Sequence, residues 1–383
     1  MTRIAMLGCG YVANMYRLTL PLHSNLTLAG VYDVERSRSE WMAETTNTAA
    51  YPSFDDLLAD TSVSLVLNLT NPSAHYETTK ALLNAGKHVY SEKPLAMRFD
   101  HAEELARLSE KTGCHLVSAP CTLLNPVAQT VWKLVRDGAI GPIRLVYAEM
   151  EDGMVHASPT SKWINEMGVA WPSVDEFEMG CTVEHAGYVL SWLCAMFGPV
   201  ATVTAHAETL VPEKIPGLAL APAHDHSVAT MRFEDGPVLR MTNGIYATHD
   251  HRLRLFGDNG VIEVEDPRND RSEVRLRSYK TLRRRRYLDK GKAVDLMGGK
   301  EAIPAYRGSQ TRDFCRAIAD LARAIDEDRM PYTGAEFALH LCELTLAAQY
   351  GSTGPDGGFG GRLASMPYTV TSRFPAPKPM GEA

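Results

Sequence analysis

Short apolar runs alternate with segments of helical periodicity along the first third of the chain. The apolar runs lie at residues 4–7, 26–32, 64–68, 88–90 and 116–119. Between them, Ser73 can cap a helix that ends before Gly86. Asp100 and Glu103 have the spacing of a capping box for a helix that ends at Gly113. Strands that alternate with helices in this way predict βαβ units and an α/β domain with a parallel sheet.

The pattern changes after Gly141. Longer runs follow in which apolar and polar residues alternate, at residues 143–150, 201–207, 227–233, 239–246 and 252–256. Such alternation is typical of strands with one solvated face, so these runs predict a large, mostly antiparallel open sheet in a second, α+β domain. Two helical stretches, 311–326 and 335–350, are expected to pack on one face of the assembly.

The chain of 383 residues is long enough for two domains. We expect the first over residues 1–122 and the second over residues 123–350. Residues 351–383 are rich in Gly and Pro, which disfavour helix interiors and central strands. We therefore expect an extended or loosely held carboxy-terminal arm.

Charge and cysteine content narrow the class of partner. Lys and Arg total 39 and Asp and Glu total 46, for a net charge of −7, which disfavours binding to nucleic acid or to anionic lipid. No apolar stretch approaches the ~20 residues that span a bilayer, and the amino terminus lacks the features of a signal peptide. The seven cysteines include no CxxC pair, so we expect reduced thiols and a cytoplasmic protein.

A glycine-rich segment follows the first apolar run and opens a helix. Its sequence, GCGYVA, has the form GxGxxA and contains Gly8, Gly10, Tyr11, Val12 and Ala13. The first glycine permits a tight turn, the second lets the backbone approach a pyrophosphate, and the alanine allows close packing of helix on strand. Free N–H groups at the helix amino terminus would bind the anion. The segment predicts a Rossmann dinucleotide site.

An acidic residue, Asp33, ends the second candidate strand. A carboxylate there accepts hydrogen bonds from the adenosine ribose and repels a 2′-phosphate, so it favours NAD over NADP. Arg36 and Arg38 lie nearby and could hold a 2′-phosphate, although as solvated surface residues they need no such role. We predict NAD as the cofactor.

Two polar segments follow later candidate strands. The first contains Thr70, Asn71, Pro72 and His75, and the second contains Glu92 and Lys93. Because open parallel sheets bind ligands at the carboxyl ends of their strands, we expect these side chains at the dinucleotide.

The GxGxxA segment, the acid after the second strand and above all the sequence SEKPLA resemble the glucose-fructose oxidoreductase, inositol dehydrogenase and rhizopine catabolism (Gfo/Idh/MocA) family. The later sequence GAIGPIRLVYAE and the helix end at residues 196–198 also have family counterparts, so the resemblance covers nearly the whole chain. It implies a Rossmann NAD-binding domain over residues 1–122 and a substrate-binding and oligomerisation domain over residues 123–350. It also implies a homodimer or homotetramer that pairs through the open face of the second sheet.

The resemblance assigns the catalytic centre to Lys93. In the family, the lysine of the Glu-Lys-Pro motif lies by the nicotinamide and the sugar hydroxyl, which implies that Lys93 polarises or helps to deprotonate the reacting alcohol. Glu92 would then hold the nicotinamide ribose. A lysine that is partly desolvated near a positive nicotinamide has its neutral form favoured, so it could take part in proton transfer. The alternative is a surface lysine that extends its ammonium into water.

The second half of the family's catalytic site is altered in this chain. Where the family has Asp followed four residues later by His, the sequence GCTVEHAGY has Glu184 and Tyr188. The spacing places both on one helix face, and a tyrosine near a lysine cation could exchange the substrate proton. His185 lies about 100° round the helix and is the alternative acid or base. We favour Glu184 and Tyr188 acting together.

Three further groups are weaker candidates. Trp163 and Trp171 precede this helix and could stack on a sugar ring, although structural tryptophans are as common. Four consecutive arginines, residues 283–286, would suit an anionic substrate group, but a solvated charge run is favoured. The histidines at positions 156, 206, 224, 226, 249 and 251 have no metal-ligand spacing with cysteine or carboxylate partners, so we predict no metal.

These features predict an NAD-dependent oxidoreductase that transfers hydride from a secondary alcohol of a sugar, cyclitol or glycoside. Glu184 and Tyr188, or His185, would bind substrate with Lys93. An alternative within the family is an NAD-dependent glycosidase that oxidises a glycoside transiently, eliminates the aglycone, adds water and returns the hydride. A non-catalytic NAD sensor is a third hypothesis, which the retained Lys93 disfavours.

Overall fold

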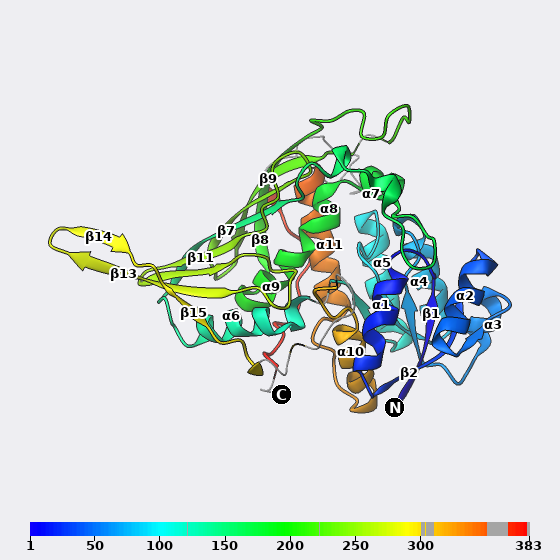
Figure 1. Cartoon of the computed structure of the whole chain (residues 1–383). Helices are drawn as coiled ribbons and strands as arrows, with labels where there is room; N and C mark the ends of the chain where they lie inside the picture. The colour runs from blue at the N-terminus through cyan, green and yellow to red at the C-terminus, as the bar shows by residue number, and fades with distance from the viewer. Residues whose placement is uncertain (121, 222, 300–302, 304–309, 351–366, 381–383) are drawn as a thin grey trace.

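A computed structural model describes residues 1–380 except 121, 222, 300–302, 304–309 and 351–366. It contains two sheets, and Figure 1 shows them on opposite sides of a central group of helices. The observed architecture is the predicted one, a Rossmann sheet followed by a second α+β unit.

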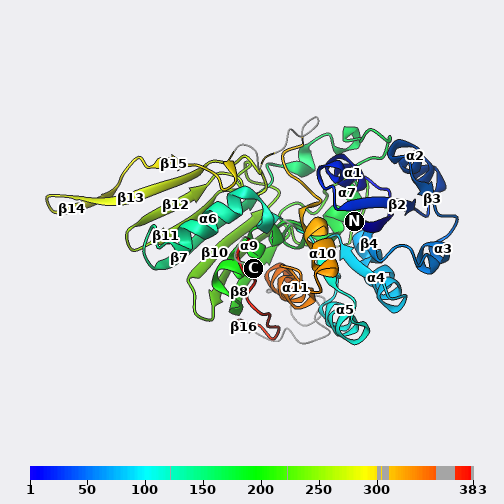
Figure 2. The ribbon, with the colours of Figure 1, turned by 90° about the horizontal axis from the view of Figure 1, so that it is seen from below.

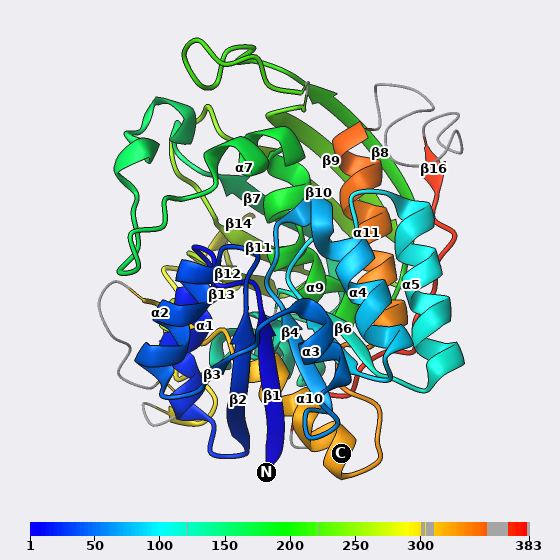
Figure 3. The ribbon, with the colours of Figure 1, turned by 90° about the vertical axis from the view of Figure 1, so that its right-hand side faces the viewer.

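The first sheet has six parallel strands in the order β3-β2-β1-β4-β5-β6. The strands are β1 (Thr2–Leu7), β2 (Leu26–Tyr32), β3 (Ala49–Ala50), β4 (Leu65–Asn68), β5 (His88–Ser91) and β6 (Leu116–Ser118). The helices that alternate with them are α1 (Ala13–Thr19), α2 (Arg36–Thr46), α3 (Phe54–Ala59), α4 (His75–Asn84) and α5 (Phe99–Thr112). The strand order reverses between β1 and β4, which lie side by side at the centre of Figure 3, and ligands of such sheets bind at the carboxyl ends of these strands.

All five predicted strands of this sheet are present within two residues of their predicted ends, whereas the two-residue β3 was not predicted. The predicted helix caps are wrong. The residue before α4 is Ala74 rather than Ser73, and the residue before α5 is Arg98, in both cases without a side-chain cap. Asp100 instead accepts a hydrogen bond from Arg98, because a guanidinium two residues away competes for its carboxylate.

The second sheet has ten strands, in the order β14-β13-β12-β11-β7-β10-β9-β8-β16, with β15 paired to β13. Its strands are β7 (Ile143–Glu151), β8 (Val200–Glu208), β9 (His226–Phe233), β10 (Val238–Gly244), β11 (Leu253–Gly257), β12 (Gly260–Val264), β13 (Val274–Leu282), β14 (Arg285–Leu288), β15 (Lys292–Val294) and β16 (Tyr368–Thr369). Pairing is antiparallel except between β7 and β10, as predicted for a mostly antiparallel sheet. The strands after β11 were not predicted.

Helices cover one face of this sheet and join it to the first (Figure 2). They include α6 (Pro126–Arg136), α7 (Ser173–Met179), α8 (Cys181–His185), α9 (Gly187–Phe197), α10 (Arg316–Asp326) and α11 (Ala335–Tyr350). The last of these packs on β8 on one side and on α5 on the other, so its side chains are buried almost all round. It therefore lies between the two sheets, where a helix that is apolar on every side is stable.

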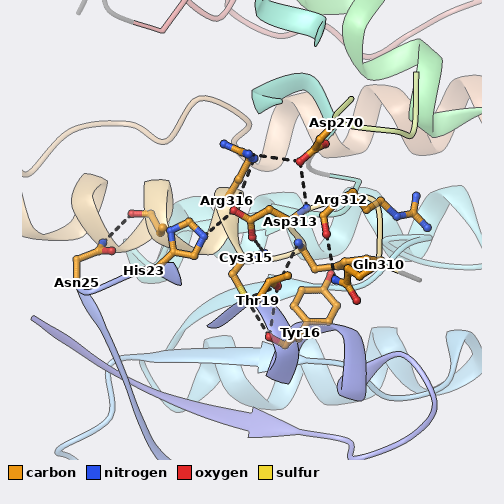
Figure 4. A network of polar contacts seen from close by, with 12 residues as sticks. Tyr16, Thr19, His23, Asn25, Asp270, Gln310, Arg312, Asp313, Cys315 and Arg316 are labelled. Carbon is orange, nitrogen blue, oxygen red and sulfur yellow. Dashed lines mark hydrogen bonds and ion pairs between the residues drawn. The ribbon is translucent and has the colours of Figure 1, made fainter. Parts of the chain in front are cut away.

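A polar network ties α10 to the nucleotide-binding sheet (Figure 4). His23 contacts Asp313 with an Nε2–Oδ2 distance of 2.9 Å, and Asn25 donates to the Ala319 carbonyl at 3.0 Å. Asp270, from the loop before β13, accepts from the Asp313 amide at 3.2 Å. The helix predicted from residues 311–326 thus links both halves of the molecule.

The described part of the carboxy-terminal arm is extended and held in place. Tyr368 and Thr369 form β16 on the edge of β8, and Val370 is buried. Glu343 of α11 accepts hydrogen bonds from Thr371 and Ser372. These contacts fix the backbone of residues 368–372, within the arm that the sequence leaves as either extended or loosely held. Residues 351–366 and 381–383 of the predicted arm lie outside the described residues.

Two properties of the described residues bear on the expected environment. Among the described helices, none is both long and apolar enough to cross a bilayer. Six cysteines are buried free thiols in the described ranges.

Candidate active site

The GxGxxA segment forms an open cradle at the carboxyl end of β1. Gly8 has a φ of +92°, and a Cβ atom there would lie 2.6 Å from the Leu69 carbonyl group, so only glycine fits. A Cβ atom on Gly10 would meet nothing within 4 Å. The first glycine thus lets the chain pass the end of β4, and the second leaves space in front of the backbone. This is the shape that a bound pyrophosphate needs.

Asp33 is fixed at the edge of this cradle. Its Oδ2 accepts a hydrogen bond from the Cys9 amide at 2.7 Å and its Oδ1 accepts one from the Glu35 amide at 2.8 Å. Arg36 is an exposed residue paired with Glu40 at 2.7 Å, one helical turn away. The carboxylate therefore occupies the position that recognises a ribose. Arg36 is paired with its own neighbour, whereas the charge of Arg38 acts on Cys9 of the cradle, where burial raises the pKa of the thiol and Arg38 partly offsets this.

The loops after β4 and β5 are joined by His75. This side chain is buried, with Nε2 2.9 Å from the Thr70 carbonyl oxygen and Nδ1 2.7 Å from that of Pro94. Burial lowers its pKa. Both ring nitrogens face backbone carbonyls, so His75 joins the two loops, and its direct contact with the cofactor stays a prediction. Asn71, from the first loop, donates to Asp175 of α7 at 3.0 Å.

Glu92 is held by a residue that was not predicted. Its Oε1 accepts a hydrogen bond from the Tyr16 hydroxyl at 2.6 Å, and its Oε2 accepts one from the Lys93 amide at 2.9 Å. Tyr16 lies on α1, three residues after Ala13 and so on the same face as the helix start. That spacing was the signal in the sequence that could have identified it. The contact links the GxGxxA helix to the Glu-Lys-Pro loop.

Lys93 and Glu184 form a buried ion pair between Nζ and Oε1, with side-chain exposures of 15% and 11%. Burial by itself lowers the pKa of Lys93. Glu184 and other nearby acidic groups raise the pKa by more than burial lowers it, so the net direction is upward. The prediction of a neutral lysine applies to a site that holds the positive nicotinamide; among the protein's own groups, the acidic neighbours outweigh desolvation and favour the ammonium form. Lys93 is an ammonium ion held in place by Glu184.

A second glutamate, Glu176 of α7, lies against the same ion pair and was not predicted. Burial raises its pKa well above the ordinary value, and Glu184 raises it further. The pKa of Glu184 is also raised by burial, but Lys93 more than reverses this and the net direction is downward. Two adjacent buried carboxyls cannot both ionise at little cost, so Glu184 carries the charge and Glu176 keeps its proton.

His185 has a carboxylate partner on the opposite side from Lys93. Its Nδ1 lies 2.7 Å from Oδ2 of Asp152, which directly follows β7, and its Nε2 lies 3.8 Å from Oε1 of Glu184. Burial raises the pKa of Asp152, but its contacts with His185, His251 and Arg268 more than reverse this and hold the pKa well below its usual range. Nδ1 of His185 and Oδ2 of Asp152 do not meet hydrogen-bond geometry, but a carboxylate this close favours the tautomer with its proton on Nδ1, which leaves Nε2 on the side of Glu184. Asp152 was not predicted.

Tyr188 begins α9 and is surrounded by cations. Its ring lies 4.9 Å from the guanidinium carbon of Arg312 and 5.6 Å from that of Arg268. The His185 ring stacks on it with a centroid distance of 6.4 Å. The structure thus brings Lys93, Glu184, His185 and Tyr188 together, as the sequence predicted.

Three of these groups, Glu184, His185 and Tyr188, line a cavity of about 360 Å³, whereas Lys93 lines a smaller neighbouring pocket that shares Glu184 and Tyr188 with it. Glu176 and both tryptophans predicted as candidates also line the larger cavity. The rings of Trp163 and Trp171 meet edge to face at 5.2 Å. A cavity with aromatic walls and several fixed polar groups suits a small polyhydroxy compound.

Comparison with known proteins identifies the family. A model described as an oxidoreductase family with an NAD-binding Rossmann fold matches residues 2–119, and a GFO/IDH/MocA C-terminal domain model matches residues 128–263. The chain belongs to the Gfo/Idh/MocA oxidoreductase family. Its cradle is therefore a nucleotide site for NAD, as the cradle's shape and Asp33 indicate.

Relatives within the Gfo/Idh/MocA family include sugar and cyclitol dehydrogenases. Myo-inositol 2-dehydrogenase of Thermotoga maritima is 25% identical over 271 residues, covering 70% of this chain and 76% of that protein. An uncharacterized oxidoreductase of Bacillus subtilis is 27% identical over 255 residues, and each protein is covered to 62%. The solved structure of levoglucosan dehydrogenase with NADH and levoglucosan has a TM-score of 0.73 at 18% identity, covering 91% of this chain and 96% of that one. At that identity the structural match shows a shared fold.

Two histidines for which the sequence predicts no carboxylate partner, His249 and His251, lie close to Asp152. The ligand atoms of Asp152, His249 and His251 lie within 4.8 Å of one another, which the sequence spacing did not predict. Antiparallel pairing of Glu151 with Asp250 places them together. Asp152 already contacts Arg268 at 3.3 Å and His251 at 3.1 Å. Because protein cations surround the carboxylate, we interpret the group as a polar network and assign no metal to it.

The four arginines at 283–286 lie far from the cavity. They occupy the end of the β13–β14 hairpin, which projects from the second sheet in Figure 1. All four are exposed. They cannot bind a substrate in this cavity of the same chain, which agrees with the favoured prediction of a solvated charge run.

Proposed function

We propose that this protein is an NAD-dependent dehydrogenase of a secondary alcohol in a sugar, cyclitol or glycoside. The observation that carries the proposal is the buried Lys93–Glu184 ion pair, which joins the nucleotide-binding sheet to the wall of the cavity. An ammonium ion fixed at this junction can stabilise the negative charge that develops on an alcohol oxygen during oxidation. The dehydrogenase activities of the named relatives point in the same direction.

The residues of the cavity would carry out proton transfer, orientation of Lys93 and contact with the substrate. The cradle of Gly8, Gly10 and Asp33 would hold NAD, which would supply the hydride acceptor for the carbinol carbon of the substrate. The hydroxyl proton passes to Nε2 of His185, and Asp152 stabilises the resulting imidazolium through Nδ1. Glu184 orients Lys93, and Glu176 retains its own proton so that the buried pair stays neutral overall. The tryptophan pair would cover one face of the sugar ring.

This assignment prefers His185 to Tyr188 as proton acceptor. His185 has an orienting carboxylate at 2.7 Å and lies 3.8 Å from Glu184. The Tyr188 ring instead has the guanidinium carbons of Arg312 and Arg268 at 4.9 Å and 5.6 Å from its centre, so it helps to form a cationic part of the cavity wall. We propose that Tyr188 contacts the substrate and that His185 exchanges its proton.

A redox-neutral NAD-dependent glycosidase is the second candidate. Net oxidation of an alcohol needs one proton acceptor, whereas elimination and rehydration of a glycoside need a further acid or base. The cavity is lined by two groups able to exchange protons, His185 and the protonated Glu176. Two such groups are what the glycosidase reaction needs, so this observation supports the glycosidase as the second candidate. A purely NAD-sensing role would leave both groups without a use.

A panel of sugars, cyclitols and aryl glycosides with NAD tests the proposal. We expect NADH absorbance to rise with at least one unmodified sugar or cyclitol, and Lys93→Met to lose about 10²–10⁴-fold in rate. Lys111→Met, an exposed lysine on α5, is the matched control and should keep full activity. Undiminished turnover by Lys93→Met would refute the catalytic assignment. Aglycone release that requires NAD but accumulates no NADH would decide for the glycosidase.

The site of action is also a proposal. We expect the protein to work in the cytoplasm on a small molecule. The buried free thiols support a reducing compartment.

A further inference from the structure

Two arginines form a cationic part of the cavity wall beside the groups assigned to catalysis. Arg268 and Arg312 both line the cavity, and their guanidinium carbons lie 5.6 Å and 4.9 Å from the centre of the Tyr188 ring. Tyr188 also lines the neighbouring pocket that contains Lys93 and Glu184. We call the two arginines the cationic wall. It lies on the side of the cavity that Tyr188 joins to the Lys93–Glu184 ion pair.

The backbone of Arg312 is fixed by contacts with both halves of the molecule (Figure 4). Gln310 donates from Nε2 to the Arg312 carbonyl at 3.0 Å and to the Met15 carbonyl of α1 at 3.3 Å. The next residue, Asp313, is buried, and its amide donates to Asp270 at 3.2 Å. Because the chain is held on either side of it, Arg312 extends its side chain from a fixed point.

Two aromatic rings support the guanidinium group of Arg312. Its carbon lies 4.7 Å from the centre of the Phe314 ring and 4.9 Å from that of Tyr188. A guanidinium group that packs on an aromatic face still donates hydrogen bonds from the edges of its own plane. This arrangement suits a side chain that presents a planar set of donors to a ligand in the cavity.

The tyrosine at position 188 belongs to this arrangement. The family pattern has histidine where this chain has Tyr188. A protonated imidazole there would repel the guanidinium groups of Arg268 and Arg312, whereas the face of a tyrosine ring attracts them. The departure from the family pattern and the cationic wall therefore form one feature, which points to the substrate of this particular chain.

An anionic group on the substrate is the ligand that matches such a wall. The planar fork of a guanidinium group binds the two oxygens of a carboxylate or of a phosphate. Arg268 also contacts Asp152 at 3.3 Å, so it contributes charge to the wall more than a directed contact. Asp152 and Glu184 line the same cavity and would repel a dianion more strongly than a monoanion, which favours a carboxylate over a phosphate.

We propose that the substrate is a sugar acid and that Arg312 binds its carboxylate, with Arg268 as a supporting charge. The carboxylate would lie on the Tyr188 side of the cavity, while a secondary hydroxyl of the same sugar lies at Lys93 and His185. This inference rests on the proposed dehydrogenase function, whose substrate class it narrows to uronic acids and related sugar acids.

Steady-state kinetics with matched sugars test the proposal. D-glucuronate and D-galacturonate are each compared with the neutral sugar and with its 6-phosphate, and the ratio of kcat/KM for the acid to that for the neutral sugar is the acid preference. We expect an acid preference of about 10–100-fold in at least one series, because a charged hydrogen bond contributes that much. Arg312→Gln should lower the acid preference at least about tenfold, mainly through KM for the acid. Arg312→Lys should restore part of it, because lysine keeps the charge but not the planar fork.

The matched control is Arg323→Gln, which replaces an exposed arginine on α10 and should leave the acid preference unchanged. Thermal unfolding of each variant shows whether it is folded. Neutral sugars that are oxidised as well as their acids would overturn the proposal, as would an acid preference that Arg312→Gln leaves intact. Preference for a 6-phosphate over the acid would overturn the carboxylate in favour of a phosphate.

Calorimetric titration of the NAD-loaded protein with the same acids separates this proposal from the dehydrogenase function. Binding of an acid that Arg312→Gln weakens at least about tenfold, without oxidation of any sugar, would retain the anion site and refute the dehydrogenase. Oxidation of a neutral sugar without binding of any acid would retain the dehydrogenase and refute the anion site. A protein that neither binds an acid nor oxidises a sugar would refute both.

Discussion

The two halves of the active site are built by different means. In the nucleotide half, two glycines and an aspartate shape the backbone within one continuous stretch of 26 residues, from Gly8 to Asp33. In the substrate half, side chains from separate segments meet, and their charges depend on one another. The nucleotide half thus defines the shape of the backbone, whereas the substrate half defines which side chains carry a proton. We therefore expect substitutions in the nucleotide half to act by steric clash, and substitutions in the substrate half to act by changing the charges of neighbouring side chains.

The largest effect should come from removing the backbone freedom of Gly8. Gly8→Ala places a Cβ atom 2.6 Å from the backbone of Leu69 at a φ of +92°, so we expect a loss of about 2–4 kcal/mol in the free energy of unfolding and no NAD binding. Gly10→Ala is the matched variant, because its Cβ meets no protein atom. It should unfold like the wild type but bind NAD at least about tenfold more weakly. Denaturant unfolding and calorimetric titration measure both quantities, and equal behaviour of the two variants would contradict the assigned roles.

The next largest effect tests the substrate half. His185→Asn removes the proposed proton acceptor with little change in size, and kcat should fall about 10²–10⁴-fold with NAD affinity unchanged. Asp152→Asn should lower kcat less, because the imidazole stays in place but loses the carboxylate that stabilises its cation. His206→Asn, at an exposed position on β8, is the control. If Tyr188→Phe abolished turnover while His185→Asn retained it, the assignment of the two residues would be reversed.

A smaller effect concerns the choice of cofactor. Asp33→Ser shortens the side chain and removes the charge that repels a 2′-phosphate, so we expect the preference for NAD over NADP to fall at least about tenfold. The carboxylate also accepts two backbone amides, so part of the lost NAD affinity will come from a looser cradle. Kinetics with both cofactors separate the two contributions. An unchanged ratio of the two kcat/KM values would exclude Asp33 as the selective group.

The smallest effect is on stability and depends on pH. The raised pKa of Glu176 means that the folded chain keeps a proton that the unfolded chain releases as the pH rises above the ordinary value of 4.5. Folded wild type therefore loses stability with rising pH, from about 4.5 up to the raised pKa, by at most about 1.4 kcal/mol per pH unit. Glu176→Gln has no proton to keep, so its advantage over the wild type in the free energy of unfolding should grow as the pH rises above the ordinary value of 4.5. A constant difference across that range would show that Glu176 is ionised in the folded protein.

The same contrast explains how far the sequence predicts the molecule. The nucleotide half can be predicted from short sequence spacings, because the turn, the helix start and the acid at the end of β2 follow each other along the chain. Lys93, Glu184, His185 and Tyr188 were predicted because they lie in or near a family motif. The first strands of the second sheet follow a local period of two residues and were predicted for the same reason.

What the sequence did not reveal depends on tertiary contacts. Asp152 reaches His185 because β7 and the segment around Asp250 pair in one particular register. Glu176 becomes protonated only where α7 meets α8, and no spacing in the sequence indicates that meeting. Strands β13 and β14 were not predicted, because consecutive arginines replace the alternation of apolar and polar residues that indicates a strand. Local patterns thus predict elements and motifs, whereas charge coupling requires the fold.

The central claim is that NAD binding and proton transfer lie in separable halves that meet at Lys93. The most direct measurement compares Lys93→Met with the wild type in two assays, the dissociation constant for NAD and the turnover number on the substrate found in the sugar panel. The account predicts an NAD dissociation constant within about threefold of wild type and a turnover number lower by about 10²–10⁴-fold. Retained turnover, or a loss of NAD binding as large as the loss of turnover, would contradict it.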